Sequence, residues 1–175
     1  MKKRNIIIIV SVIVVLIAVV AVFAVLNAGD VEEKKALEAK KLISIKSEGK
    51  ELAAVGSEII NSLDLIDFSA TKDTSETGPE EHYYTGVALI DILDKMDIET
   101  GDYSSLVARA IDGYTVAFET EEVLAENNIY VVFKEDGKFL GTKSQGGKGP
   151  YMIIVREDPF SQRWCKYLIE LELVK

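Results

Sequence analysis

Two cations near the end of the sequence, Arg163 and Lys166, are the residues best suited to hold an anionic ligand. Guanidinium and ammonium groups bind phosphate through charge-assisted hydrogen bonds. Both follow the segment 141–149, which contains four glycines and no apolar side chain. The alternative is that both are ordinary exposed positions of an acidic domain, which needs some positive charge.

The glycine-rich segment offers a second anion site, through Lys143, Lys148 and the backbone N–H groups around them. A flexible surface connection explains the same composition and is the favoured interpretation. The segment lacks the glycine and lysine spacing of a P-loop. The sequence therefore does not support nucleotide hydrolysis.

His82 and Tyr114 are the remaining candidates for a binding or catalytic site. A histidine can act as an acid or base near neutral pH, but no Ser, Cys or Asp is placed by the sequence as a partner of His82. A structural or exposed histidine is the favoured interpretation. Tyr114 follows the turn dipeptide at 112–113 and lines either a pocket or the core. The sequence names no catalytic residue.

Metal chemistry has little support, because Cys165 is the only cysteine and His82 the only histidine. A single cysteine excludes an intramolecular disulfide and any zinc or iron–sulfur site with several cysteines. The sequence therefore predicts no metal site and requires no cofactor. Flanked by Trp164 and Tyr167, Cys165 is expected to be a small buried hydrophobe.

The net charge limits the partners of the chain. The formal charge is −9, and residues 1–27 contain three cations and no acid, so the remainder is more acidic still. Nucleic acids and anionic membrane surfaces both bind clustered Lys and Arg. We therefore expect neither as a partner of the domain, whereas a small anionic ligand or a protein partner is compatible with its charge.

The N-terminus predicts a membrane anchor. After a tail, residues 1–5, the segment Ile6 to Leu26 has Ser11 as its only polar residue and is long enough to span a bilayer. Three cations precede this segment and acids follow it, so we expect a single-pass protein of the cell membrane with a cytoplasmic N-terminus and an extracytoplasmic domain. The alternative is a signal peptide cleaved after Ala28, but the apolar run exceeds the usual 7–15 residues of such peptides.

The remaining sequence predicts a helical stalk, residues 27–41, and an α+β domain, residues 42–175. Strong helix formers dominate the stalk. In the domain, apolar periodicity predicts helices over 51–61 and 87–97, a short helix capped by Thr120, and a polar loop over 71–81. Gly86 is expected to end a short strand. The other strands are expected at 42–46, 63–71, 82–85, 106–111, 114–119, 129–133, 151–155 and 167–173.

Five segments in this order resemble the molybdopterin-binding domain of the sulfite oxidase family. The resemblance in the order and spacing of the segments extends over about residues 42–174. The segments are Tyr84-Thr85-Gly86-Val87-Ala88-Leu89, Asp112-Gly113-Tyr114-Thr115, Glu122-Val123-Leu124-Ala125, Gly146-Gly147-Lys148-Gly149-Pro150 with the strand after it, and Arg163-Trp164-Cys165-Lys166-Tyr167-Leu168.

The resemblance implies a sulfite-oxidase-like fold and a pocket for molybdopterin, with Arg163 and Lys166 near the cofactor's phosphate. Enzymes of this family hold molybdenum through a cysteine thiolate, at a place where this chain has Ser69-Ala70-Thr71-Lys72-Asp73. Cys165 replaces a core valine of the family and does not substitute for that cysteine.

We therefore expect a noncatalytic extracytoplasmic module that binds a pterin-like or anionic ligand, or a partner protein. Two alternatives stay open. One is a molybdopterin-dependent oxidoreductase with an unusual metal ligand, and the other is a purely structural envelope protein.

Overall fold

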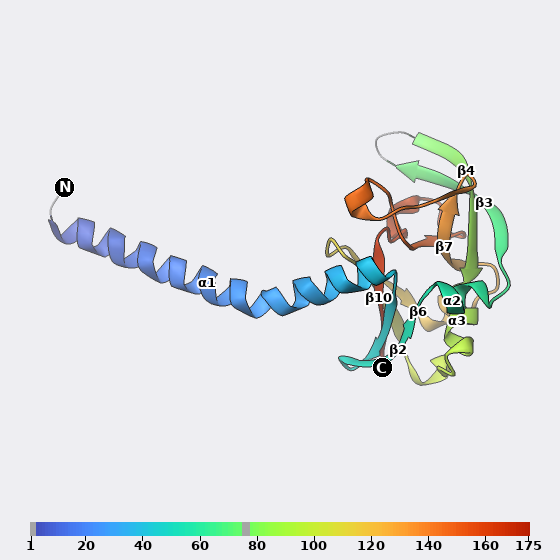
Figure 1. Ribbon diagram of the computed structural model, residues 1–175, viewed down its shortest axis with the longest axis horizontal. Coiled ribbons are helices and arrows are strands. Elements are labelled where there is room, and N and C mark those ends of the chain that lie inside the picture. The colour runs from blue at the N-terminus through green and yellow to red at the C-terminus, as the bar shows by residue number, and fades with distance from the viewer. Residues whose placement is uncertain (1–2, 75–77) are drawn as a thin grey trace. The chain divides into compact units, whose positions relative to one another are not determined.

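The computed structural model describes residues 3–74 and 78–175 and divides into two compact units, Met1–Ala36 and Leu37–Lys175. Helix α1, Lys3–Lys40, is continuous through the predicted span and stalk (Figure 1). Its segment Ile7–Val25, with mean hydropathy 3.5, is long and apolar enough to cross a membrane, and its side chains are not buried inside the protein. The first two residues of the predicted tail lie outside the described part.

The second unit contains two sheets. The first has the strand order β2-β1-β10-β5-β6, with β1 (Ile43–Ser47) parallel to β10 (Leu168–Val174). The other pairs are antiparallel, and the remaining strands are β2 (Lys50–Val55), β5 (Ser105–Ala110) and β6 (Thr115–Glu119). The first and last strands of the domain, β1 and β10, thus lie side by side in the interior of this sheet.

The second sheet has the order β3-β4-β7-β8, and β9 also pairs with β7. All of these pairs are antiparallel. The strands are β3 (Ile66–Thr74), β4 (Gly78–Ala88), β7 (Ile129–Glu135), β8 (Lys138–Phe139) and β9 (Met152–Val155). Every residue of β9 is buried, as is typical of a strand covered on both faces.

Short helices connect the strands, and α2 and α3 lie next to one another (Figure 1). They are α2 (Ser57–Asn61), α3 (Leu89–Lys95) and α4 (Thr120–Leu124), with single 3₁₀ turns η1 (Thr100–Asp102), η2 (Lys143–Gln145) and η3 (Ser161–Arg163). The mixed α+β class expected from the sequence is confirmed.

The helix expected over 51–61 is mostly wrong. Residues 50–55 form β2, which pairs with β1, and only Ser57–Asn61 is helical. Leu52, expected on an apolar helix face, is 50% exposed on this edge strand. Pairing with a neighbouring strand overrides the local helical spacing.

The predicted cap of α4 is also wrong. Glu119 is the N-cap, and it forms a reciprocal capping box with Glu122. Thr120 is instead the first helical residue, and its hydroxyl donates to the carbonyl of Tyr103 at 2.7 Å.

The predicted end of a strand at Gly86 and the loop over 71–81 are wrong in their described parts. Strand β4 continues through Gly86, where a Cβ would lie 2.5 Å from the carbonyl oxygen of Val131. Glycine here marks a close approach of β4 to β7, at an irregularity in their register. Strands β3 and β4 pair as far as Thr74 and Gly78, and residues 75–77 lie outside the described residues. The polar residues at this end of the hairpin are exposed or half-buried in its described part.

Candidate functional site

Two pockets share Trp164, and together we call them the Trp164 cleft. The first has a volume of about 280 Å³ and the second about 360 Å³. The first pocket is lined by Ser69, Ala70, Thr71, Val155, Arg156, Asp158, Pro159 and Trp164. The second is lined by Lys72, Asp112, Tyr114, Ser161, Gln162, Trp164, Lys166 and Tyr167.

Strand β3 lines both pockets, and the turn η3 lines the second. Thr71 lines the first pocket, and the next residue of the strand, Lys72, lines the second. The hydroxyl of Ser161, at the start of η3, donates to the carbonyl of Asp73 at 2.6 Å. This bond ties η3 to the end of β3 that carries Lys72.

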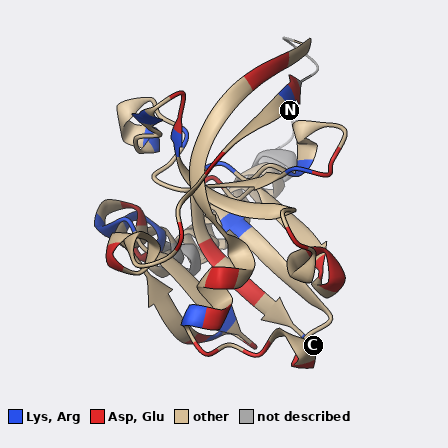
Figure 2. Cartoon of the chain, turned by 90° about the vertical axis from the view of Figure 1, so that its right-hand side faces the viewer, with Lys and Arg blue, Asp and Glu red and all other residues tan. Residues whose placement is uncertain are grey.

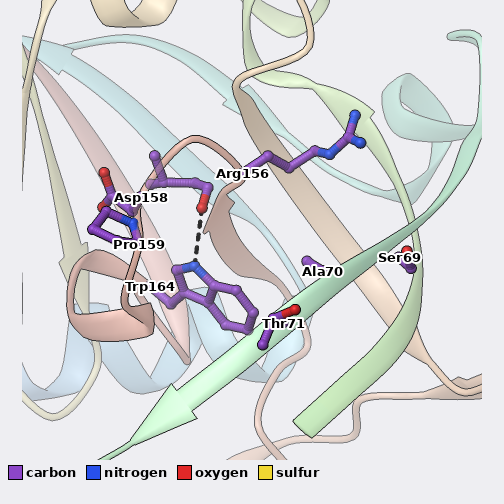
Figure 3. A pocket seen from close by; sticks show the side chains of 8 residues that line it. Ser69, Ala70, Thr71, Arg156, Asp158, Pro159 and Trp164 are labelled. Atoms are coloured by element: carbon purple, nitrogen blue, oxygen red, sulfur yellow. Dashed lines mark hydrogen bonds between the residues drawn. The ribbon is translucent and has the colours of Figure 1, made fainter. Parts of the chain in front are cut away.

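Trp164 is held firmly between the two pockets and is only 7% exposed. Its indole N–H donates to the carbonyl of Val155 at 3.2 Å (Figure 3). Its ring lies edge-on to Tyr84, with 5.7 Å between centroids and 88° between planes. The next residue, Cys165, exchanges two backbone hydrogen bonds with Ile153 of β9, which fixes the backbone beside the indole.

Two cations without acidic partners face the second pocket. Among the described residues, no carboxylate lies within salt-bridge distance of Lys72 or Lys166. Acidic and basic segments are otherwise interspersed over the domain (Figure 2). Partial burial, followed by the charges of Lys72 and Lys148, lowers the pKa of Lys166. A bound anion would relieve this repulsion between like charges.

Tyr114 and Lys143 lie around the same pocket. The Tyr114 hydroxyl donates to the carbonyl of Gln162, and burial raises its pKa. The Lys143 ammonium lies 3.5 Å from a carboxylate oxygen of Asp112 and 5.2 Å from the ring centre of Tyr167. Both partners of Lys143 line the second pocket. The structure thus brings together three of the five predicted site residues.

Arg163 is directed into a different set of contacts. Its guanidinium binds both carboxylate oxygens of Asp158 and reaches Glu122 of α4 at 2.8 Å. It also lies over the ring of Phe118, 5.6 Å from its centre. Arg163 does not line either pocket of the cleft. Arg163 therefore connects η3 to α4 through its ion pair with Glu122.

His82 lies in an acidic cluster on β4 and also lines neither pocket. Its Nδ1 is 2.8 Å from a carboxylate oxygen of Asp136 and 3.7 Å from Glu135. Glu135 also accepts hydrogen bonds from Tyr84 and Lys148. Asp136 is the acidic partner that the sequence did not identify.

The backbone of the glycine-rich segment is occupied with its own hydrogen bonds. The N–H groups of Gly147 and Gly149 donate to the carbonyls of Thr142 and Gly141, and that of Lys143 donates to Glu38. The N–H groups at 145, 146 and 148 also have carbonyl acceptors inside the segment or next to it. This loop is a compact structural element, and these N–H groups are engaged within the protein.

Comparisons with known proteins agree with this architecture at the level of the fold. No protein-family model matches the chain, and no curated protein sequence matches it. The structure is similar to the sulfane dehydrogenase SoxCD from Paracoccus pantotrophus, with a TM-score of 0.61 and 16% identity over 76% of this chain. The domain has a sulfite-oxidase-like fold. The match covers 38% of the SoxCD chain, so this chain spans well under half of that protein's length.

The residues present do not fit the thiolate ligation of molybdenum that the resemblance implies. At the corresponding place, Ser69 to Thr71 lie within the paired strand β3 and carry no thiol. Cys165 is fully buried, which confirms the sequence interpretation, and burial raises its pKa to about 12. The thiol therefore stays protonated at neutral pH and lies outside the cleft lining. Within the described residues, no group of three His, Cys, Asp or Glu side chains is placed to hold a metal.

Sequence reasoning missed Lys72, Arg156 and Trp164. In the sequence, Lys72 stands out only as part of the segment at the place of the family's cysteine. The guanidinium of Arg156 lies 5.2 Å from the ring centre of Phe68 and extends away from Trp164 (Figure 3). The only tryptophan of the chain, next to Lys166, was a signal that could have identified the centre of the cleft.

Proposed function

We propose that this protein is a membrane-anchored, noncatalytic binding module whose Trp164 cleft holds an anionic, pterin-like ligand. One observation carries the proposal: Lys72 and Lys166, far apart in sequence, face one aromatic pocket of an acidic domain, and within the described residues neither has a carboxylate at salt-bridge distance. Lysine ammonium groups hold phosphate by charge, and the rings of Tyr114, Trp164 and Tyr167 supply flat apolar surfaces for a ring system.

The proposed location is the outer side of the cytoplasmic membrane. The apolar segment of α1 supplies the span, and cations occur before it while the first charges after it are acidic. This asymmetry favours a cytoplasmic N-terminus. A protease added to intact spheroplasts should remove the domain, whereas protection of the domain would contradict this orientation.

The proposed absence of catalysis rests on the donors around the cleft. A metal bound by a pterin dithiolene takes soft additional ligands such as thiolate, and hydroxyl groups are poor replacements. The cleft offers the hydroxyls of Ser69 and Thr71 and the ammonium of Lys72 at the corresponding place. His82 is paired with Asp136, but no nucleophile is among its polar contacts.

Trp164 provides the test, because the chain's only tryptophan is in contact with both pockets. The full chain in detergent would be titrated with a phosphorylated pterin and with inorganic phosphate, while Trp164 fluorescence is measured. We expect the phosphorylated pterin to quench the fluorescence saturably and to bind more tightly than phosphate.

The double variant Lys72→Ala/Lys166→Ala should weaken this binding at least tenfold, since each charged hydrogen bond contributes about 1.5–3 kcal/mol. Lys95→Ala, an exposed lysine at the end of α3, is the matched control and should bind as the parent does. Equal affinity of the double variant and the control would overturn the assignment of the site.

A further inference from the structure

A third pocket, larger and more apolar than either pocket of the Trp164 cleft, lies elsewhere on the domain. It has a volume of about 480 Å³, within the range of sites for small molecules. Its apolar walls are Ile60, Leu65, Phe133, Phe139, Leu140, Pro150 and Tyr151. We call it the apolar pocket, and it shares no lining residue with the Trp164 cleft.

The walls of this pocket leave large apolar side chains in contact with water. Phe139 is 76% exposed and Leu65 is 50% exposed. The Phe139 ring stacks on Phe133, with 6.2 Å between centroids and 28° between planes. Exposed apolar side chains gathered around a pocket of this size indicate a binding surface, because each would gain by leaving water.

The glycine-rich loop gives this pocket a firm wall. Leu140, Gly141, Thr142 and Gln145 line it. A Cβ on Gly147 would lie 2.1 Å from the carbonyl oxygen of Leu140, so only glycine allows the loop to pack against itself here. The pocket is therefore formed by the fold before a ligand binds.

Cations lie at the pocket without acidic partners. The Lys134 ammonium is 5.0 Å from the ring centre of Phe139 and 5.9 Å from that of Phe133. Lys41 lines the same pocket. In the described part of the chain, neither lysine has a carboxylate within salt-bridge distance. The complementary ligand has an apolar body and one anionic group.

We propose that the apolar pocket binds an anionic amphiphile, with its acyl chain between Leu65 and Phe139 and its acidic head at Lys134. The connectivity of the chain favours a ligand from the membrane. Lys41 is the first residue after α1, the helix that also contains the apolar segment Ile7–Val25. The pocket is thus tethered to a segment suited to the bilayer. A free fatty acid and an anionic phospholipid share the required chemistry.

Photo-crosslinking of the full chain in phosphatidylcholine vesicles tests this proposal. One sample would contain a diazirine-bearing fatty acid and another a diazirine-bearing phosphatidylglycerol, each at low mole fraction. Mass spectrometry would compare the adducts on Phe139 with those on Phe160, which is 54% exposed and lines none of the three pockets. We expect at least fivefold more adducts at Phe139. Labelling by the first probe alone identifies a free acid, and labelling by the second identifies a membrane lipid.

Two variants test the roles of the wall and of the charge. Phe139→Asp should reduce labelling of the other pocket residues about fivefold, because it places a carboxylate in the apolar wall. Lys134→Gln should reduce it about threefold, whereas Lys138→Gln, an exposed neighbour, should leave it unchanged. Equal labelling at Phe139 and Phe160, or labelling of the pocket that persists in Phe139→Asp, would overturn the proposal. Exclusive capture of another protein at this surface would also overturn it.

Discussion

Lys72 of β3 and Lys166, just before β10, line the same pocket, and the charge of Lys72 contributes to lowering the pKa of Lys166. Partial burial is the larger cause. Replacing Lys72 with Ala should therefore raise the pKa of Lys166 without restoring the ordinary lysine value of about 10.4. NMR titration of the Lys166 side chain measures this, and an unchanged or lower pKa would contradict the arrangement.

The lowered pKa of Lys166 also predicts how anion binding depends on pH. Lys166 holds an anion only while protonated, so affinity should fall as pH rises through its pKa, earlier than for an ordinary lysine. Lys166→Arg keeps its charge to much higher pH. Fluorescence titrations at increasing pH should show that this variant retains binding where the parent loses it. Parallel losses in both proteins would indicate that another group controls binding.

Arg163→Ala should lower stability more than it lowers anion binding. The change removes the ion-pair partner of Asp158 and Glu122 and the cation over the ring of Phe118. We expect the free energy of unfolding to fall by about 1–3 kcal/mol. Lys166→Ala should leave the free energy of unfolding nearly unchanged, because Lys166 is exposed and no carboxylate of the described residues lies within salt-bridge distance of it. Denaturant unfolding of both variants measures this difference in stability. If Arg163 served only to bind the ligand, the two variants would be equally stable.

Gly86→Ala should destabilise the domain by about 1–3 kcal/mol or more. The added Cβ would lie 2.5 Å from the carbonyl oxygen of Val131 and 2.8 Å from the Cα of Val132, and backbone atoms cannot move aside cheaply. Gly101→Ala is the control, because nothing lies within 4 Å of its Cβ position. Thermal unfolding should show a lower midpoint for the first variant alone, and equal midpoints would contradict the close approach of β4 to β7.

Because burial raises the pKa of Cys165, we expect the domain to lose stability at alkaline pH. Burial raises the pKa of this thiol from 9.0 to about 12, so between these values the unfolded chain releases a proton that the folded chain keeps. Stability contributed by the neutral thiol is complete below pH 9 and should decline between pH 9 and 12. Cys165→Ala should flatten this part of the stability curve. A curve of the same slope in both proteins would show that other groups control it.

The sequence predicted the parts of the fold whose apolar pattern is strong. The buried strands β7 and β9 and the turn between β5 and β6 follow directly from their residues. It failed at β2 and at the polar end of the β3–β4 hairpin, because pairing with β1 and between β3 and β4 decides those conformations. Both are hairpins of consecutive strands, and the residue pattern within one strand does not show that it pairs with the next.

The candidate site was only partly predictable for a similar reason. The sequence indicates Lys166 as a cation after the glycine-rich segment and Tyr114 as a ring next to a turn, and both line the second pocket. From the sequence alone, Arg163 is as good a candidate for anion binding as Lys166. Its ion pairs with Asp158 and Glu122 depend on where η3 meets α4, which the sequence does not show. Lys72 reaches the pocket only because the hairpin is longer than its composition suggests.

The central claim is that the cleft binds an anionic ligand without holding a catalytic metal. Elemental analysis of the full chain, purified from membranes of cells that make molybdopterin, tests it most directly when combined with pterin fluorescence of the denatured sample. The account predicts no stoichiometric molybdenum or tungsten, together with a pterin or another phosphate-bearing compound that Lys72→Ala/Lys166→Ala fails to retain. About one molybdenum or tungsten atom per chain would contradict it.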